Sequence, residues 1–322
     1  MKKILLLLLI MISVSSCYED YIEDFDYSSV YFSYQVDVRT FVVGEGMKIN
    51  VGVALGGVVN NTREMNVQYK LEPALLTPEI LATMKAGTAY IKNAVSNVNA
   101  LQLLPVNYYT ISDQENFVIE PGAHSGKLLI KPDSATFLAD VNTITPVYAL
   151  PFLITTSDAD TILAGKEYSV IGLKFENMLF GNYWHGGETV VKDGSGNVLQ
   201  TLRYYTSIPV PETKVWNLVT QAPFELTVNG YSDIKSTKPE IRLVQSGGDI
   251  TISSAQNSTF AYLPDGENKF NQATLLQNRK IFLKYKYQNS VGNWCYATDT
   301  LTFRNRLRDG VLEWQDENPS HY

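Results

Sequence analysis

The sequence predicts an all-β protein with two domains. Apolar residues recur at every second position over most of the chain, which is the period of half-buried strands. Clusters of Gly, Pro, Asn and Asp separate these runs, as turns do in sandwiches and barrels. The chain has 322 residues, about twice the usual size of one domain. We expect an N-terminal immunoglobulin-like β-sandwich with one short helix, followed by a C-terminal antiparallel β-barrel, lipocalin-like, or a second sandwich.

Residues 1–16 are typical of a secretory signal peptide. Lys2 and Lys3 precede an apolar run over residues 4–12, which is too short for a membrane-spanning helix of about 20 residues. The following Val14-Ser15-Ser16-Cys17 resembles the bacterial lipobox. This resemblance implies cleavage before Cys17 and its acylation, and several acyl chains would hold the protein firmly at a membrane. The alternative is a soluble secreted protein in which Cys17 is incidental.

Residues 17–27 are acidic and aromatic without a clear period, and we interpret them as a lipidated tether. Acidic residues directly after the lipid-bearing cysteine resemble the signal that sends lipoproteins of Bacteroidetes to the outer face of the outer membrane. We therefore expect a lipid-anchored protein of the outer membrane that faces the cell exterior. A merely solvated linker is the alternative.

Residues 28–176 are expected to form the N-terminal β-sandwich. Apolar and polar residues alternate from Ile49 to Leu55 and from Met65 to Leu71, as in half-buried strands. One helical segment interrupts them, because Thr77 can cap a helix and Pro78 suits its first position. Apolar residues then follow at near-helical spacing up to Val95. We expect this helix to cross one end of the sandwich.

Three segments of this domain carry a family resemblance: residues 103–110 (LLPVNYYT), 117–123 (FVIEPGA) and 148–154 (YALPFLI). They resemble the N-terminal sandwich domain of unknown function found in many Bacteroidetes surface lipoproteins. That domain often precedes a carbohydrate-active or adhesin-like domain encoded in polysaccharide-utilisation loci. The segments are strand and turn signals, so the resemblance implies a fold and a setting but no site residue.

Residues 177–322 are expected to form the C-terminal domain. Turn sequences at residues 193–197, 246–249 and 289–293 each lie between two strand-like runs and predict three β-hairpins. Antiparallel strands joined in this way close readily into a barrel or a sandwich. This half, with its ending at residues 301–314, resembles the C-terminal domain of unknown function that is often paired with the first. The resemblance transfers no functional residue.

The sequence offers little for catalysis or metal binding. Its histidines, His124, His185 and His321, are isolated from one another, and no His-Glu-x-x-His, Cys-x-x-Cys or Gly-x-Ser-x-Gly motif occurs. We expect no enzyme, no cofactor and no metal.

A glycoside hydrolase, or an accessory protein to one, stays a less favoured hypothesis. Two carboxylates would suffice for its chemistry, and Glu188 with Asp193 or Glu313 with Asp316 could supply them. Relatives with known glycosidase action, however, carry it on an additional barrel domain with an Asp-x-x-Asp-x-Asp-x-Glu signature. This chain lacks that signature.

Charge and cysteine content exclude other classes. The formal net charge of −7 becomes −9 once Lys2 and Lys3 leave with the signal peptide. Such a surface repels nucleic-acid phosphates unless a local basic patch exists, and none stands out in the sequence. Cys295 has no partner within the mature chain apart from the lipid-bearing cysteine, so we expect a buried, unpaired thiol.

The aromatic content, with Tyr 20, Phe 13 and Trp 4, points to glycan binding, because aromatic rings stack on the C–H faces of sugars. Most aromatic residues belong in the core. If Cys295 and Ala297 are buried, however, Trp294 and Tyr296 face outward unless a bulge changes the parity. We predict these two as ligand-binding residues, with Tyr183 and Trp184 as weaker candidates.

We therefore expect a non-catalytic cell-surface lipoprotein that binds a polysaccharide or oligosaccharide for an uptake system. Its other partners would be the outer membrane, through the lipid anchor, and other proteins of the uptake system. The alternative is an adhesin-like or structural surface protein that binds a protein partner.

Overall fold

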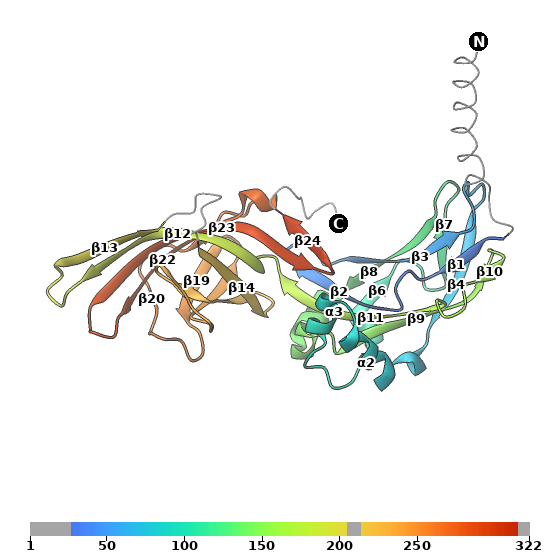
Figure 1. The fold of residues 1–322 in the computed structure, drawn as a ribbon, viewed down its shortest axis with the longest axis horizontal. Coiled ribbons are helices and arrows are strands. Elements are labelled where there is room, and N and C mark those ends of the chain that lie inside the picture. The colour runs from blue at the N-terminus through green and yellow to red at the C-terminus, as the bar shows by residue number, and fades with distance from the viewer. Residues whose placement is uncertain (1–26, 205–213, 315–322) are drawn as a thin grey trace, which may run out of the picture.

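The computed structural model of the chain describes residues 27–204 and 214–314. The predicted signal peptide, Cys17 and nearly all of the tether lie outside these residues. The described chain forms two β-rich bodies that lie end to end along the long axis of the molecule (Figure 1). The predicted fold class, a sandwich followed by a barrel-like domain, is confirmed. Within the described ranges, no helix has the length and apolarity needed to cross a membrane.

The N-terminal body is a sandwich of two sheets. Its first sheet has the strand order β10 (Thr161–Ile162), β1 (Ser29–Tyr31), β3 (Ile49–Gly56), β8 (Ser125–Pro132), β6 (Tyr109–Ile111). The second has the order β2 (Val36–Val43), β11 (Tyr168–Asn177), β9 (Tyr148–Ser157), β4 (Met65–Leu71), β7 (Asn116–Ile119), and β5 (Gln102–Leu103) pairs with β9. Neighbouring strands are antiparallel except β1 with β10, β2 with β11 and β5 with β9.

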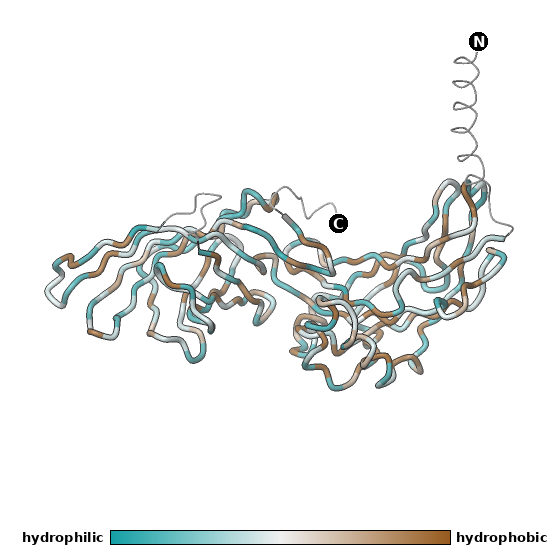
Figure 2. Tube along the Cα trace, in the orientation of Figure 1, coloured by the Kyte–Doolittle hydropathy of each residue, from teal (hydrophilic) through white to brown (hydrophobic). Residues whose placement is uncertain are grey.

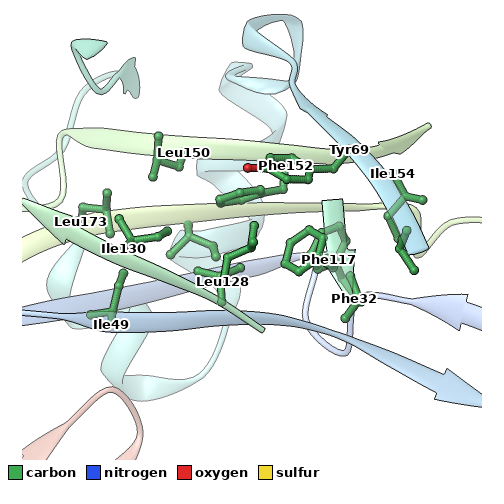
Figure 3. Packing of buried hydrophobic residues seen from close by; sticks show 14 of the residues in the cluster. Phe32, Ile49, Tyr69, Phe117, Leu128, Ile130, Leu150, Phe152, Ile154 and Leu173 are labelled. Atoms are coloured by element: carbon green, nitrogen blue, oxygen red, sulfur yellow. The ribbon is translucent and has the colours of Figure 1, made fainter. Parts of the chain in front are cut away.

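The sandwich core lies between these two sheets. In β3 the burial alternates as the sequence predicts, since Ile49, Val51, Val53 and Leu55 are buried and the residues between them are not. Aromatic rings lie together in one part of this layer (Figure 3), and the ring centroids of Phe32 and Phe117 lie 5.7 Å apart at an interplanar angle of 79°. Such edge-to-face contacts stabilise a core beyond the area that they bury.

The helical segment differs from the prediction, because it contains two helices, α2 (Pro78–Ala86) and α3 (Ala89–Ala94). Thr77 caps α2 as expected, its hydroxyl accepting a hydrogen bond from the Ile80 amide at 3.3 Å. The expected place was wrong, since α2 and α3 cover the outer face of the second sheet and not one end of the sandwich (Figure 1). Val38 and Val170 of that face are apolar and need this cover. The described helices also include α4 (Ser134–Ala139) and the short 3₁₀ turns η1 (Pro73–Leu75), η2 (Val106–Tyr108), η3 (Val141–Ile144) and η4 (Leu276–Asn278).

The C-terminal body is a barrel-like antiparallel sheet. Its circuit runs β12 (Gly181–Lys192), β14 (Lys214–Ala222), β15 (Glu225–Val228), β18 (Ile241–Ser246), β19 (Asp249–Ser254), β21 (Lys269–Phe270), β22 (Lys280–Gln288), β23 (Trp294–Arg308), and β23 pairs again with β12. Outside the circuit are β13 (Val198–Tyr204), β24 (Val311–Trp314), β20 (Leu263–Pro264) and a small hairpin of β16 (Gly230–Tyr231) and β17 (Ile234–Lys235). The three predicted hairpins join β12 to β13, β18 to β19 and β22 to β23. The closed circuit decides for the barrel over a second sandwich.

A buried ion-pair cluster joins the two bodies. Glu45 follows β2, and its carboxylate oxygens lie 2.7 Å from Arg279 Nη1 and 2.7 Å from Arg306 Nη2. Arg306 also lies 2.5 Å from Glu313, which in turn pairs with Arg308. Burial alone would raise the pKa of the Glu45 carboxyl, but the charges and hydrogen bonds of Arg306 and Arg279 hold that pKa below its ordinary value. The cluster therefore stays charged at neutral pH.

A second polar contact crosses the same junction. Thr40 of β2 donates two hydrogen bonds to the Asp309 carboxylate, from its hydroxyl at 2.8 Å and from its amide at 3.1 Å. Asp309 lies in the turn between β23 and β24. Burial raises the pKa of this carboxyl to about 6, although the bonds from Thr40 act in the opposite direction.

Candidate functional site

Three neighbouring strands of the barrel, β12, β23 and β22, share one surface that faces away from the core. Directly opposed residues of antiparallel strands point to the same side, and the register opposes even-numbered residues to even-numbered residues from Trp184 to Lys192 and from Lys280 to Gln288. Figure 2 shows hydrophilic and hydrophobic segments alternating along these strands. We call this surface the outer face; it comprises Trp184, Glu188, Val190, Lys192, Lys280, Phe282, Lys284, Lys286, Gln288, Trp294, Tyr296, Thr298, Thr300 and Thr302, together with Arg304, which lies over the Trp184 ring.

Trp294 and Tyr296 lie side by side on the outer face, as the parity argument predicts. Both side chains are half-buried, whereas Cys295 and Ala297 between and beside them point into the core. The pairing of β23 with β22 runs without a shift through residues 297–301, so no bulge changes the parity. Burial raises the pKa of the Cys295 thiol, in agreement with an unreactive core cysteine.

Lysine side chains lie over the two rings. Lys192 Nζ is 4.8 Å from the ring centroid of Tyr296, and Lys286 Nζ is 5.8 Å from the same centroid and 5.9 Å from that of Trp294. These cation–π contacts place the ring faces on the open side of the sheet. Because a lysine side chain is flexible and strongly hydrated, it can leave the ring when a ligand stacks there.

Trp184 and Tyr183, the weaker candidates, lie on opposite sides of β12. Trp184 belongs to the outer face, where the Arg304 guanidinium lies 4.7 Å from its ring centroid. Tyr183 is fully buried in the barrel core, with its ring edge-on to Phe303 at 5.5 Å. A ligand on the surface therefore cannot reach Tyr183, and its prediction as a ligand-binding residue was wrong. The cause is strand parity, which always sends adjacent residues to opposite faces.

Phe282 is a residue of the outer face that the sequence analysis missed. Its side chain is 42% exposed, and it lies opposite Thr300, in the threonine row that continues the face beyond Tyr296. The sequence contained a signal for this residue, because Phe282 has the same parity as the lysines of its strand and not that of Ile281 and Leu283. Exposed aromatic residues that share one face of a sheet are typical of binding surfaces.

The inside of the barrel holds a buried polar cluster around Asp299. Asp299 accepts hydrogen bonds from the hydroxyls of Tyr204 at 2.6 Å and Tyr285 at 2.7 Å. His185 Nε2 lies 3.3 Å from Asp299, but its ring is packed 3.6 Å from that of Trp216. The nearby Ser232 hydroxyl bonds to Thr189 and Tyr287 and not to His185. A serine nucleophile activated by histidine is therefore not assembled here.

The surface also has two hollows that could hold a ligand. One, of about 770 Å³, lies between the two bodies and is lined by Lys48, Phe224 and Gln245 among others. The other, of about 450 Å³, opens beside the small hairpin and is lined by Ser232 and Tyr287 among others. In the second hollow the hydroxyls of Ser232 and Tyr287 already bond to each other. Aromatic rings also line this hollow, but Tyr231, Phe260 and Tyr287 pack on one another there, whereas Trp294 and Tyr296 of the outer face turn toward the open side of the sheet.

Comparisons with known proteins describe the fold and no activity. A family model described as an N-terminal domain matches residues 22–161. No curated protein matches the chain. A crystal structure of unknown function from Bacteroides ovatus, at 2.40 Å resolution, is similar with a TM-score of 0.62 and 18% identity, covering 91% of this chain and 98% of that one. A second from the same organism has a TM-score of 0.43 and 12% identity, over 90% and 100% of the two chains. The first likeness shows a shared two-domain fold.

Proposed function

We propose that the chain is a non-catalytic cell-surface lipoprotein that binds glycan on its outer face for a polysaccharide-uptake system. The observation that carries this proposal is the pair of adjacent rings, Trp294 and Tyr296, beside the row Thr298, Thr300 and Thr302. Aromatic rings stack on sugar C–H faces, and threonine hydroxyls can donate to or accept from sugar hydroxyls. An open sheet face also suits an extended polymer better than an enclosed pocket does.

The state of the carboxylates supports a binding role over a hydrolytic one. On the outer face, Glu188 is paired with Arg203 at 2.7 Å. Asp193 accepts hydrogen bonds from the amides of Ser195 and Asn197 within its own turn, and Glu313 is buried among arginines. These three carboxylates have structural partners, and Asp316 lies outside the described residues. A glycosidase needs two carboxyl groups that face a common substrate.

The anchor belongs to the same proposal. Acylated Cys17 would hold the protein at the outer membrane. The acidic residues after Cys17 would direct the protein to the cell exterior, where it can contact polysaccharide. Replacing Cys17 by alanine should release the protein from the membrane fraction. Protease added to intact cells should digest the wild type, and complete protection would contradict the outward orientation while leaving the anchor.

The binding proposal is tested with the chain from Tyr18 onward on a glycan array. We expect binding to at least one polysaccharide without release of oligosaccharides. Binding to a protein partner with no glycan bound would favour the adhesin-like alternative. Release of oligosaccharides under the same conditions would favour the hydrolase.

A further inference from the structure

The outer face differs in charge from the rest of the molecule. The whole chain carries a formal net charge of −7, yet the face presents lysines along β22 and at the end of β12. The carboxylates near it have partners: Glu188 pairs with Arg203 at 2.7 Å, Asp265 with Lys286 at 3.0 Å, and Glu267 with Lys269 at 3.0 Å, although Glu267 also feels the charge of Lys284. Among the residues that the structure describes, Lys192, Lys280 and Lys284 form no ion pair. A local positive surface on an acidic protein attracts anions selectively.

From this we propose that the glycan bound on the outer face is acidic, bearing carboxylate or sulfate groups. This inference rests on the proposed function and names its ligand class. Lys192 and Lys286 stand on either side of the Tyr296 ring, on strands that are two spacings apart, roughly 10 Å. A sugar ring stacked on Tyr296 would therefore place its charged substituents within reach of both lysines. The threonines beside the ring would meet its hydroxyls.

The small number of cations favours a glycan over a nucleic acid, which also offers rings and charges. The basic side chains of the outer face are Lys192, Lys280, Lys284, Lys286 and Arg304, on a chain of formal net charge −7, and Lys286 is already paired with Asp265. Nucleic-acid binding draws much of its affinity from many phosphate contacts. A polysaccharide can instead be held by stacked rings and hydroxyl contacts with few charges.

The test uses the chain from Tyr18 onward against polygalacturonate, alginate, chondroitin sulfate, amylose, mannan and single-stranded DNA. We expect the strongest binding to an acidic glycan, and a loss of roughly tenfold in affinity when salt rises from 50 to 200 mM, as expected for about two neutralised charges. Carboxyl reduction or desulfation of that glycan should weaken binding about as much.

The double variant Lys192→Gln/Lys284→Gln should also lose roughly tenfold in affinity and most of the salt dependence. The control Lys92→Gln/Lys127→Gln removes two exposed lysines of the N-terminal domain and should bind like the wild type. A different result would be salt-insensitive binding to amylose or mannan that Lys192→Gln/Lys284→Gln keeps and Trp294→Ala loses. It would contradict the proposal that the glycan is acidic and would still agree with the proposed function. Equal or tighter binding to DNA would contradict a glycan as the ligand. Binding to none of the glycans would contradict both the proposed function and the acidic class of the ligand.

Discussion

The molecule has two clusters of cationic side chains, and they differ in burial and in pairing. At the junction of the domains, Arg279 and Arg306 are 1% exposed, and each meets a carboxylate at 2.7 Å or less. On the outer face, Lys192 and Lys284 lie at the surface and form no ion pair with any residue that the structure describes. A buried charge must be paired to be tolerated, whereas an exposed lysine needs no partner. The first cluster is therefore explained by folding alone, and the second leaves its charge available to a ligand.

Glu45→Gln should have the largest effect on stability. The substitution leaves Arg279 and Arg306 buried with part of their charge uncompensated, which costs about 3 to 5 kcal/mol. Urea unfolding followed by tryptophan fluorescence measures the loss. The matched control Glu225→Gln breaks the more exposed pair with Arg242 and should cost about 1 kcal/mol or less. Equal effects of both variants would contradict the distinction between the two kinds of ion pair.

The junction should also respond to pH through Asp309. Its pKa in the folded protein, about 6, lies above the ordinary value of 3.8, so the folded state binds the proton more tightly. Its contribution to stability is fully present below pH 3.8 and is lost as the pH rises through about 6. In Asp309→Asn this dependence disappears. Between pH 4 and pH 7 the unfolding free energy of the variant, relative to that of the wild type, should therefore rise by about 2 kcal/mol.

Asparagine tolerates the left-handed backbone at this position, where φ is 49°. Urea unfolding of both proteins at several pH values gives the difference between their unfolding free energies. The difference is used because Glu45 changes the stability of both proteins with pH in the opposite direction. The lowered pKa of Glu45 stabilises the protein above its ordinary value of 4.5 and loses that effect as the pH falls. A constant difference between wild type and Asp309→Asn across this range would contradict the raised pKa.

Tyr183→Phe should have the smallest effect. Within the described chain, the Tyr183 hydroxyl is buried without a hydrogen-bond partner, so its removal should leave stability unchanged or raise it by up to about 1 kcal/mol. Glycan affinity should stay the same, because the residue faces the core. A loss of affinity in Tyr183→Phe, measured by calorimetric titration, would show that Tyr183 contributes to glycan binding.

Strand parity could be read from the sequence, while contacts between distant segments could not. The alternation from Trp294 to Phe303 was enough to place Trp294 and Tyr296 on the outside. The ion pair of Glu45 with Arg306 joins residues 261 positions apart, and no local sequence pattern predicts such a contact. The basic character of the outer face was hidden for a similar reason, since Lys192 and Lys286 come together only when β12 and β22 both pair with β23.

The central claim is that Trp294 is an anchor for glycan and not a core residue. The direct measurement is a calorimetric titration of wild type and Trp294→Ala with the strongest-binding glycan, accompanied by thermal unfolding of both. We predict that the variant loses about 1 to 4 kcal/mol of binding free energy with nearly unchanged stability. The control Tyr34→Ala, which removes a 64% exposed ring from the N-terminal domain, should bind normally. Unchanged affinity in Trp294→Ala, or a loss of about 3 to 5 kcal/mol in unfolding free energy as for a core aromatic, would contradict the account.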